Sequence, residues 1–372
     1  MQAHNFPFLE TPSRIAIVTD AWDPQINGVV HTLKSTCAEL RRQGHVVKLI
    51  CATDLRSFGL PGFPDVRLAL QPYDHVRGTL DSFSPDYIHL ATEGPLGLAA
   101  RRYCLRRQLA FTSSYHTRFP EYLRARCGLP KFIGYRWLRW FHRHSQAIMV
   151  PTQAIREQLI ARGFSKVVLW GRGVDTEHFR PAHDNRHDRA IERPLHLYVG
   201  RVAVEKNIEQ FLALDLPGSK WVIGDGPHRE ALEAKFPGVR FLGAKSHRDL
   251  PGYYNYADVF VFPSRTDTFG LVLVEAMACG VPIAAYPVAG PIDVVAHTRS
   301  GILDDDLAAA CRAALTLDRA GVRAHALEFS WEAATRQFQE HLHPAGLLAR
   351  HGSKPAWGKR EARPALRAPD TP

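Results

Sequence analysis

Short apolar runs and segments of helical periodicity alternate along the chain. Residues 14–19 (RIAIVT) are typical of a buried strand, residues 29–43 have a helical pattern that ends at Gly44, and residues 45–52 (HVVKLICA) predict a second strand. Because a helix connects these strands, we expect them to lie parallel in one sheet. Further strands are predicted at 87–90 (YIHL), 110–115 (AFTSSY) and 147–151 (AIMVP).

The second half of the chain restarts this α/β pattern after a polar stretch. Residues 182–193 (AHDNRHDRAIER) have no apolar periodicity and predict a linker, and LHLYVGRVAVEKNIEQFL predicts a new strand, loop and helix. A length of 372 residues also favours two domains. We therefore predict an α/β fold with two parallel-sheet, Rossmann-like domains that face a cleft. The expected parts are a first domain at 1–182, a linker at 183–194, a second domain at 195–328, a last helix at 329–343 and a disordered tail at 344–372.

The most informative stretch is 264–282 (SRTDTFGLVLVEAMACGVP). The aromatic and β-branched run Val259–Phe262 before it predicts a buried strand, and a helix is expected at about 269–279. Gly280 is placed to cap the C-terminus of this helix. The candidates for its N-terminal cap are Thr266, Asp267 and Thr268.

Two acids in this stretch, Asp267 and Glu275, are separated by about 12 Å along a helix axis. The paired carboxyls of a retaining glycosidase lie about 5 to 5.5 Å apart, so this pair does not fit a hydrolytic site. The free N–H groups at the helix start, which belong to Phe269, Gly270 and Leu271, favour an anion. A ligand with a polyol at each end and a diphosphate between them is a nucleotide sugar. The alternative is that the acids are a helix cap and a solvated helix residue.

The spacing of Asp267 and Glu275 resembles the acid-x7-acid motif of the family-4 retaining glycosyltransferases, which are enzymes of the GT-B fold. Supporting segments occur in the expected order over nearly the whole chain. The resemblance implies that Asp267, one methylene shorter than the usual Glu, contacts hydroxyls of the transferred sugar, and that Glu275 binds the ribose of the nucleotide. It also implies that Gly28 faces the donor diphosphate and that the last helix crosses back over both domains.

Four further positions are candidates for the site. His116 follows the strand 110–115, at the sheet edge where ligands bind in open α/β sheets. Arg201 and Lys206 flank the first loop of the second domain, where a guanidinium and an ammonium suit a diphosphate. In the resembled family the matching histidine contacts the transferred sugar, the matching cations stabilise the leaving nucleotide diphosphate, and the turn that matches Gly226 lies beside the base. The alternatives are a structural histidine and a solvated pair of cations.

Positive charge is concentrated in the first half of the chain. Residues 1–182 carry 24 Lys and Arg against 14 Asp and Glu, whereas residues 183–372 carry 23 of each. Eleven basic residues and one acid, Glu121, lie between Arg101 and Arg143, where aromatic residues are interspersed (YRWLRWFHRH). Such a segment suits an anionic lipid surface, and nucleic acid or a merely solvated basic helix are the alternatives. We expect membrane contact rather than nucleic-acid binding. Glu121, near His116, is a weaker candidate for the site, and the alternative is a pair with one of the arginines.

Several classes of protein are disfavoured. No run approaches 18 apolar residues, and the first residues do not resemble a signal peptide, so we expect a cytoplasmic protein with peripheral contact on the cytoplasmic face of the inner membrane. The six cysteines are scattered, which indicates reduced thiols rather than a zinc site. Neither G-x-G-x-x-G nor a P-loop motif occurs, which disfavours dehydrogenases and P-loop enzymes.

These observations predict a retaining hexosyltransferase that takes a hexose from GDP-mannose or a UDP-hexose. No cofactor or metal ion is expected, because Arg201, Lys206 and the helix amides would stabilise the departing diphosphate. The expected acceptor is a membrane lipid such as diacylglycerol. The alternatives are transfer to a soluble glycan or small molecule, a GT-B nucleotide-sugar epimerase, and a basic protein that binds lipid or nucleic acid without catalysis.

Overall fold

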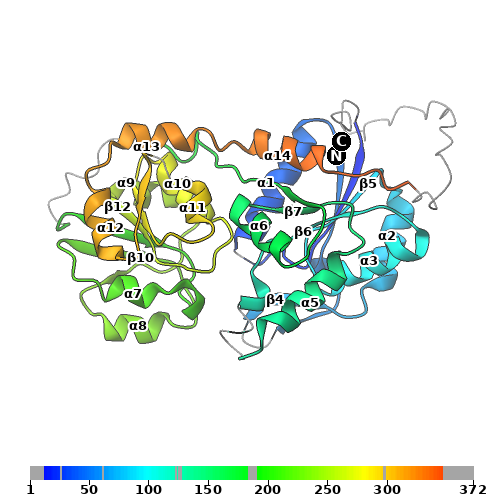
Figure 1. Ribbon diagram of the computed structural model, residues 1–372, viewed down its shortest axis with the longest axis horizontal. Helices are drawn as coiled ribbons and strands as arrows, with labels where there is room; N and C mark the ends of the chain where they lie inside the picture. The colour runs from blue at the N-terminus through cyan, green and yellow to red at the C-terminus, as the bar shows by residue number, and fades with distance from the viewer. Residues whose placement is uncertain are drawn as a thin grey trace, which may run out of the picture.

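Two lobes lie side by side, and each is built on one six-stranded parallel sheet (Figure 1). The computed structural model describes residues 12–25, 27–60, 63–121, 124, 128–182, 191–295 and 299–346. The predicted fold class, two Rossmann-like parallel-sheet domains, is therefore confirmed. Most of the predicted linker, at 183–194, falls on residues outside the described ones.

The first sheet has the strand order β2-β1-β5-β6-β7-β8. The interior strand β1 is apolar from Ile15 to Val18 because helices cover both faces of a parallel sheet, and Ile15, Ala16, Ile17 and Val18 are fully buried. A short antiparallel hairpin lies beside this sheet and was not predicted, nor was the edge strand β8. The strands of this lobe are β1 (Arg14–Val18), β2 (Val46–Ile50), β3 (Ser57–Leu60), β4 (Phe63–Ala69), β5 (Tyr87–Leu90), β6 (Thr112–Ser114), β7 (Ile148–Val150) and β8 (Val167–Leu169).

The second sheet has the order β11-β10-β9-β12-β13-β14 and is likewise parallel throughout. Leu195 to Val199 and Val259 to Phe262 are buried along its two central strands. The strands of this lobe are β9 (Leu195–Val199), β10 (Ser219–Ile223), β11 (Arg240–Phe241), β12 (Val259–Phe262), β13 (Ile283–Ala285) and β14 (Gly301–Leu303).

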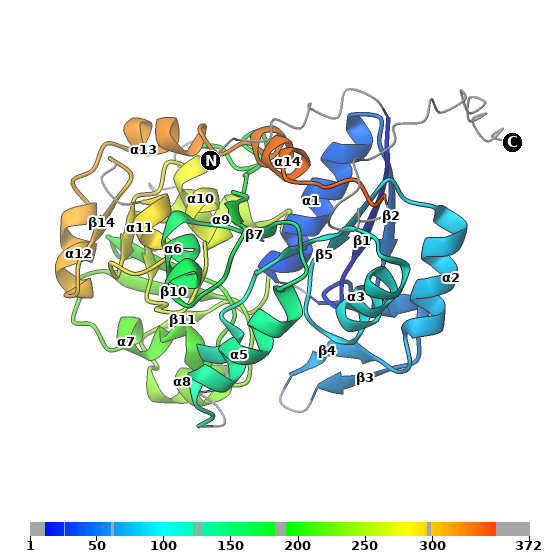
Figure 2. The same cartoon turned by 45° about the vertical axis from the view of Figure 1, so that its right-hand side comes forward.

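Helices cover the faces of both sheets (Figure 2). Those of the first lobe are α1 (Gly28–Arg42), η1 (Ala52–Asp54), α2 (Tyr73–Phe83), α3 (Pro95–Arg107), α5 (Lys131–His142) and α6 (Gln153–Ala161). Those that follow β9 are η3 (Val204–Lys206), α7 (Ile208–Leu212), α8 (Arg229–Lys235), α9 (Leu250–Tyr256), α10 (Leu271–Ala278), α11 (Pro291–Val294), α12 (Leu307–Ala314), α13 (Arg319–Ala326) and α14 (Trp331–Glu340).

The last helix, α14, returns from the second lobe and packs on α1 of the first (Figures 1 and 2). Ser330 caps its start, and the Phe338 ring is buried in the same cluster as Ile15. The tail was predicted to start at 344, but the chain is still bound to the first lobe at Ala345. The Ala345 N–H donates to the Asp86 carbonyl at 2.7 Å. Residues 347–372 lie outside the described part.

Strand order also shows where a ligand can bind. In each sheet the order reverses beside the first strand, between β1 and β5 in one lobe and between β9 and β12 in the other. Ligands of open α/β sheets bind beyond the carboxyl ends of the strands at such a reversal. The loops that follow β9 and β12 contain Arg201, Lys206 and Asp267, so the fold brings these predicted site residues together.

Candidate functional site

The loop 263–270 connects β12 to α10, and Gly270 determines how it enters the helix. Gly270 has a φ of +87°, and a Cβ there would lie 3.0 Å from a Leu273 methyl and 3.1 Å from the Phe262 ring. The helix therefore begins at Leu271, with Gly270 as its N-terminal cap and no side chain capping it. The predicted start at 269 and the predicted side-chain cap are wrong. The Asp267 and Thr268 side chains are left for other partners.

Asp267 forms an ion pair with Lys206 across the reversal of the second sheet. The Lys206 Nζ lies 2.5 Å from Asp267 Oδ1, and the two side chains are only 23% and 16% exposed. Within the described residues, Asp267 Oδ2 is buried and has no hydrogen-bond partner. The Thr266 hydroxyl donates to the Glu205 carbonyl at 3.0 Å, which ties the two loops together. One oxygen of Asp267 thus holds a cation, and the other can accept a hydrogen bond from a ligand hydroxyl.

His116 lies just beyond β6, as predicted, and is buried. The Arg172 Nη2 donates to its Nδ1 at 3.1 Å, while its Nε2 is buried without a partner in the part of the chain that the structure describes. Burial, with the Arg172 charge as a second cause, holds the pKa of His116 well below its usual value, so the ring is neutral. An imidazole that accepts at Nδ1 carries its proton on Nε2. His116 therefore offers one N–H that no described group satisfies.

Arg172 was missed by the sequence analysis. Its guanidinium stacks 4.5 Å from the Trp170 ring and donates to the carbonyls of Trp170 and Gly171. Burial lowers the pKa of Arg172 to about 9. The sequence carries no signal of this role, because an arginine in the run GRGVD reads as one more surface cation.

Hydrogen bonds between the lobes bring His116 to the Asp267 loop. The Thr268 hydroxyl donates to the His116 carbonyl at 2.8 Å, and the Thr152 hydroxyl donates to the Thr268 carbonyl at 3.1 Å. The Ala154 N–H also donates to the Asp293 carboxylate at 3.0 Å. The histidine of one lobe and the acid–lysine pair of the other therefore belong to one site.

The N-terminus of α1 faces the N-terminus of α10. A Cβ on Gly28 would lie 3.6 Å from a Leu271 methyl, so Gly28 lies beside the start of α10. The Asn27 side chain caps α1 by accepting from the N–H groups of Val29 and Val30, each at 3.0 Å. These two amides are consequently occupied, and Gly28 itself provides the accessible backbone of this turn.

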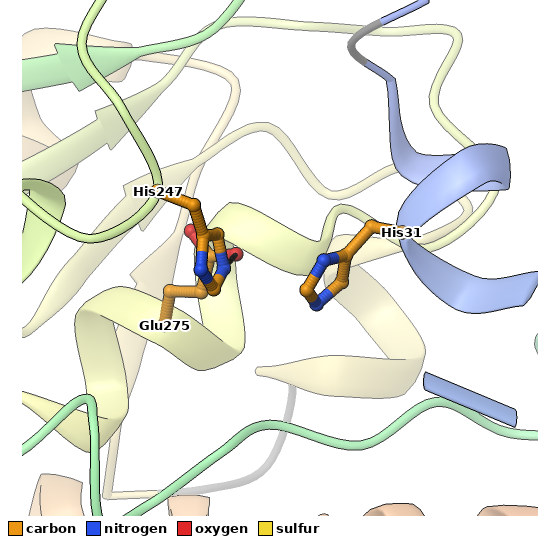
Figure 3. A group of neighbouring side chains, drawn as sticks. All are labelled: His31, His247 and Glu275. Carbon is orange, nitrogen blue, oxygen red and sulfur yellow. Dashed lines mark ion pairs between the residues drawn. The ribbon is translucent and has the colours of Figure 1, made fainter. Parts of the chain in front are cut away.

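Glu275 lies on α10 and is buried, so the alternative of a solvated helix residue is wrong. The Tyr254 hydroxyl donates to its Oε2 at 2.9 Å, and the His247 Nε2 lies 3.6 Å from its Oε1. Figure 3 shows the His247 ring beside Glu275 and the His31 ring reaching toward them from α1. Tyr254, His247 and His31 were not predicted, because nothing in their spacing indicates that they meet.

Two residues predicted to bind the donor, Gly226 and Phe269, also have a structural role. A Cβ on Gly226 would lie 2.3 Å from the Val202 carbonyl, so a glycine lets this turn pack against the loop after β9. The turn borders a pocket of about 510 Å³. Phe269 is buried in the core and its ring lies edge-on to Phe329, so only its backbone is available to a ligand.

The basic segment divides into a buried part and an exposed part. Arg101 is buried and donates to the carbonyls of Phe141 and Trp140, so it does not belong to a surface patch as predicted. Glu121 accepts from Tyr135 and pairs with Arg118 at 3.6 Å, which agrees with the alternative of a pair with an arginine. On α5, in contrast, apolar and basic side chains share one exposed surface, which we call the α5 surface: Phe132, Ile133, Arg136, Trp137, Arg139, Trp140 and Arg143.

Comparison with known proteins shows the same organisation over most of the chain. Residues 26–178 match the family described as Glycosyltransferase Family 4, and residues 193–317 match Glycosyl transferases group 1. A GDP-mannose-dependent alpha-mannosyltransferase of Mycobacterium tuberculosis is 31% identical over 317 residues, which cover 78% of this chain and 83% of that protein.

Two further similar proteins extend the comparison. An alpha-monoglucosyldiacylglycerol synthase of Streptococcus pneumoniae is 24% identical over 73% of this chain and 71% of its own length. The solved structure of a sucrose-phosphate synthase from Thermosynechococcus elongatus superposes with a TM-score of 0.72 at 22% identity, covering 88% of this chain and 97% of that one.

Proposed function

The chain belongs to glycosyltransferase family 4, and from this premise we propose that it is a retaining hexosyltransferase that moves mannose from GDP-mannose to a membrane lipid. Membership of this family supports a glycosyltransferase that uses a nucleotide sugar. The retention of configuration is proposed from the site, and the donor and acceptor are proposed from the relatives.

One observation carries this proposal: the Asp267 loop lies between Lys206 of its own lobe and His116 of the other. A hexose seated there would place its hydroxyls against the unpaired Oδ2 of Asp267 and the Nε2–H of His116. Its diphosphate would extend toward Lys206 and Arg201, and its ribose toward Glu275. This arrangement assigns one chemical group of the donor to each predicted residue.

The proposed reaction needs cations where the leaving group departs. As the bond between the sugar C1 and the diphosphate oxygen breaks, negative charge develops on that oxygen, and Lys206 and Arg201 stabilise it. The acceptor hydroxyl attacks C1 from the same face, and its proton passes to the departing diphosphate. The product therefore has the same configuration at C1 as the donor, and no covalent intermediate forms. Because protein cations hold the diphosphate, we propose that transfer requires no metal ion.

The donor and the acceptor are inferred from the relatives. The mycobacterial relative is named for GDP-mannose and is the reason to place this donor before UDP-hexoses. The streptococcal relative is named for a glucosylated diacylglycerol, which supports a lipid acceptor. No helix among the described residues has the length and apolar character required to cross a bilayer.

A direct assay tests the proposed function. The purified protein is incubated with GDP-mannose, UDP-glucose, UDP-galactose or UDP-glucuronate and a bacterial lipid extract, and products are identified by mass spectrometry and by the anomeric coupling in NMR. We expect a mannosyl lipid with the α configuration of the donor, and no product from Glu275→Gln. An inverted product would refute retention. Transfer from GDP-mannose only to water or to soluble glycans would refute the lipid acceptor.

The α5 surface is the proposed membrane contact. Phe132 is 70% exposed, Ile133 47% and Trp140 41%, while Arg136 and Arg139 lie exposed among them. Amphipathic rings and arginines on one face suit the boundary between headgroups and acyl chains of an anionic bilayer. The inward face of the same helix, with Tyr135, Leu138 and Phe141 buried, anchors it to the lobe.

We expect Phe132→Ser to weaken binding to anionic vesicles about 10- to 150-fold, because an inserted aromatic side chain contributes about 1.5 to 3 kcal/mol. Co-sedimentation with phosphatidylglycerol vesicles measures this. Leu327→Ser is the matched control, since Leu327 is also more than half exposed but lies on the far lobe, after α13. Equal binding by wild type and Phe132→Ser would contradict the proposed contact.

A further inference from the structure

Two histidines and one glutamate from both lobes converge at the end of the candidate site. His31 lies on α1 of the first lobe, whereas His247 and Glu275 belong to the second (Figure 3). One ring nitrogen of each histidine and one oxygen of Glu275 all lie within 4.8 Å of one another. The centroids of the two imidazole rings lie 4.6 Å apart, and the ring planes are tilted by 36°.

The three side chains have the properties of metal ligands. Imidazole nitrogen and carboxylate oxygen are donors that Zn²⁺ prefers, and two histidines with one glutamate form a known three-ligand set that keeps a position open. The Tyr254 hydroxyl holds Oε2 of Glu275 at 2.9 Å, which orients the carboxylate as an outer-shell partner does at metal sites.

The geometry needs only a small adjustment to bind an ion. Zinc bonds to nitrogen and oxygen of about 2.0 to 2.2 Å require ligand atoms somewhat closer together than 4.8 Å. The His247 Nε2 and Glu275 Oε1 are already 3.6 Å apart, and the His247 side chain is 43% exposed. Rotation of His247 and a slight approach of α1 would complete the site.

We propose that His31, His247 and Glu275 form a binding site for a zinc-type transition-metal ion, and that the bound ion excludes the donor. The exclusion rests on the proposed function, in which Glu275 binds the ribose, because the carboxylate cannot serve both ligands at once. The ion also bridges the two lobes, because His31 lies on α1 and Glu275 on α10, and it occupies the space between these helices in place of the donor. It acts as an inhibitor and takes no part in the transfer reaction.

Binding is tested first with Co²⁺ alone, whose visible absorption reports nitrogen and oxygen ligands, on the full-length protein without donor. We expect one Co²⁺ per chain, displaced by one equivalent of Zn²⁺. Loss of an outer-shell partner alone weakens metal sites by about 10- to 100-fold. Because His31 and His247 are direct ligands, His31→Ala and His247→Ala should each weaken binding at least about tenfold. Absence of a Co²⁺ spectrum, or a spectrum unchanged in both variants, would overturn the site.

His75→Ala is the matched control for these variants. His75 lies on α2, at the side of the first lobe away from α10, and is not one of the three proposed ligands (Figure 1). The control should keep wild-type Co²⁺ affinity, so a loss there equal to that of His247→Ala would indicate general disruption and overturn the assignment of ligands.

Competition is tested separately by kinetics. With free Zn²⁺ at ten times the wild-type dissociation constant, the apparent KM for the donor should rise about elevenfold in the wild type and no more than about twofold in His31→Ala. Chelation of zinc by the donor is the same for both proteins and cancels in this comparison. If Co²⁺ binds but zinc leaves KM unchanged, the metal site stands and the exclusion of donor is refuted. If transfer fails without any added metal, the proposed function is at fault instead.

Discussion

Exchange of Lys206 for alanine is expected to lower kcat/KM for sugar transfer by about 10² to 10³, the usual cost of removing one preorganised group that stabilises developing negative charge. The Lys206 Nζ lies 2.5 Å from Asp267 and is mostly shielded from solvent, so water cannot replace it well. Its removal also leaves the Asp267 carboxylate without its counter-ion beside a diphosphate. Both effects raise the energy of the transition state, and the loss should appear mainly in kcat. Initial rates over a range of GDP-mannose concentrations measure it.

A second ion pair with the same separation provides the control. Lys235 lies 2.5 Å from Glu209, but these side chains are 61% and 52% exposed, and such surface pairs contribute at most about 1 kcal/mol. Lys235→Ala should therefore retain wild-type rates. A Lys206→Ala enzyme with unchanged kcat and only a raised KM would show that Lys206 binds the ground state and does not stabilise the departing diphosphate.

Much of the fold could be predicted because hydrophobic periodicity and the residues that end helices, such as glycine, are local signals. The run at 14–19 and the helix that ends before Gly44 correspond to β1 and α1, and the central strands of both sheets are continuously apolar as parallel sheets require. The hairpin β3–β4 and the edge strand β8 were not foreseen. β8 spans only Val167–Leu169, and so short an apolar run does not distinguish a strand from other structure.

The start of α10 shows why element boundaries are harder. Threonine and aspartate before a helix are strong capping signals, yet Gly270 takes the capping position by its left-handed backbone, and Asp267 turns to Lys206. The ion pair between Asp267 and Lys206, which are 61 residues apart, takes the Asp267 side chain away from the helix start, and no local sequence pattern predicts this contact.

The candidate site divides in the same way. Asp267, Glu275 and Lys206 could be found from their spacing within motifs, and the fold places Asp267 with Lys206 and Glu275 beside α1. His31 and His247 are separated by most of the chain, and their meeting depends on how the two lobes sit against each other. Arg172 and His116 are 56 residues apart, and their meeting depends on how the first lobe folds.

Arg172 is a positioning residue, and we expect Arg172→Met to lower kcat by about 10². A guanidinium can only donate, so its bond to Nδ1 of His116 keeps the proton of the ring on Nε2, the atom that faces the site. Without it both neutral tautomers become populated, and the one that carries the proton on Nδ1 offers the sugar an acceptor instead of a donor. The guanidinium has no carboxylate partner among the described residues, so methionine leaves no buried charge unpaired, and the variant should fold.

The pH dependence and the tautomer distinguish this role from a merely structural one. The Arg172 charge is the second cause, after burial, of the low pKa of His116, so its removal raises that pKa. A higher pKa means that the ring becomes protonated at a less acidic pH, and the acid limb of kcat in Arg172→Met must therefore move to higher pH, whereas wild type stays active further into acid. Nitrogen-15 NMR of the histidine rings should show Nε2–H for His116 in the wild type and a mixture in the variant. Arg172→Lys, which still donates, should recover the Nε2–H form and part of kcat. If the tautomer and the acid limb are the same in wild type and Arg172→Met, Arg172 only supports the packing of Trp170, and His116 is oriented by its burial alone.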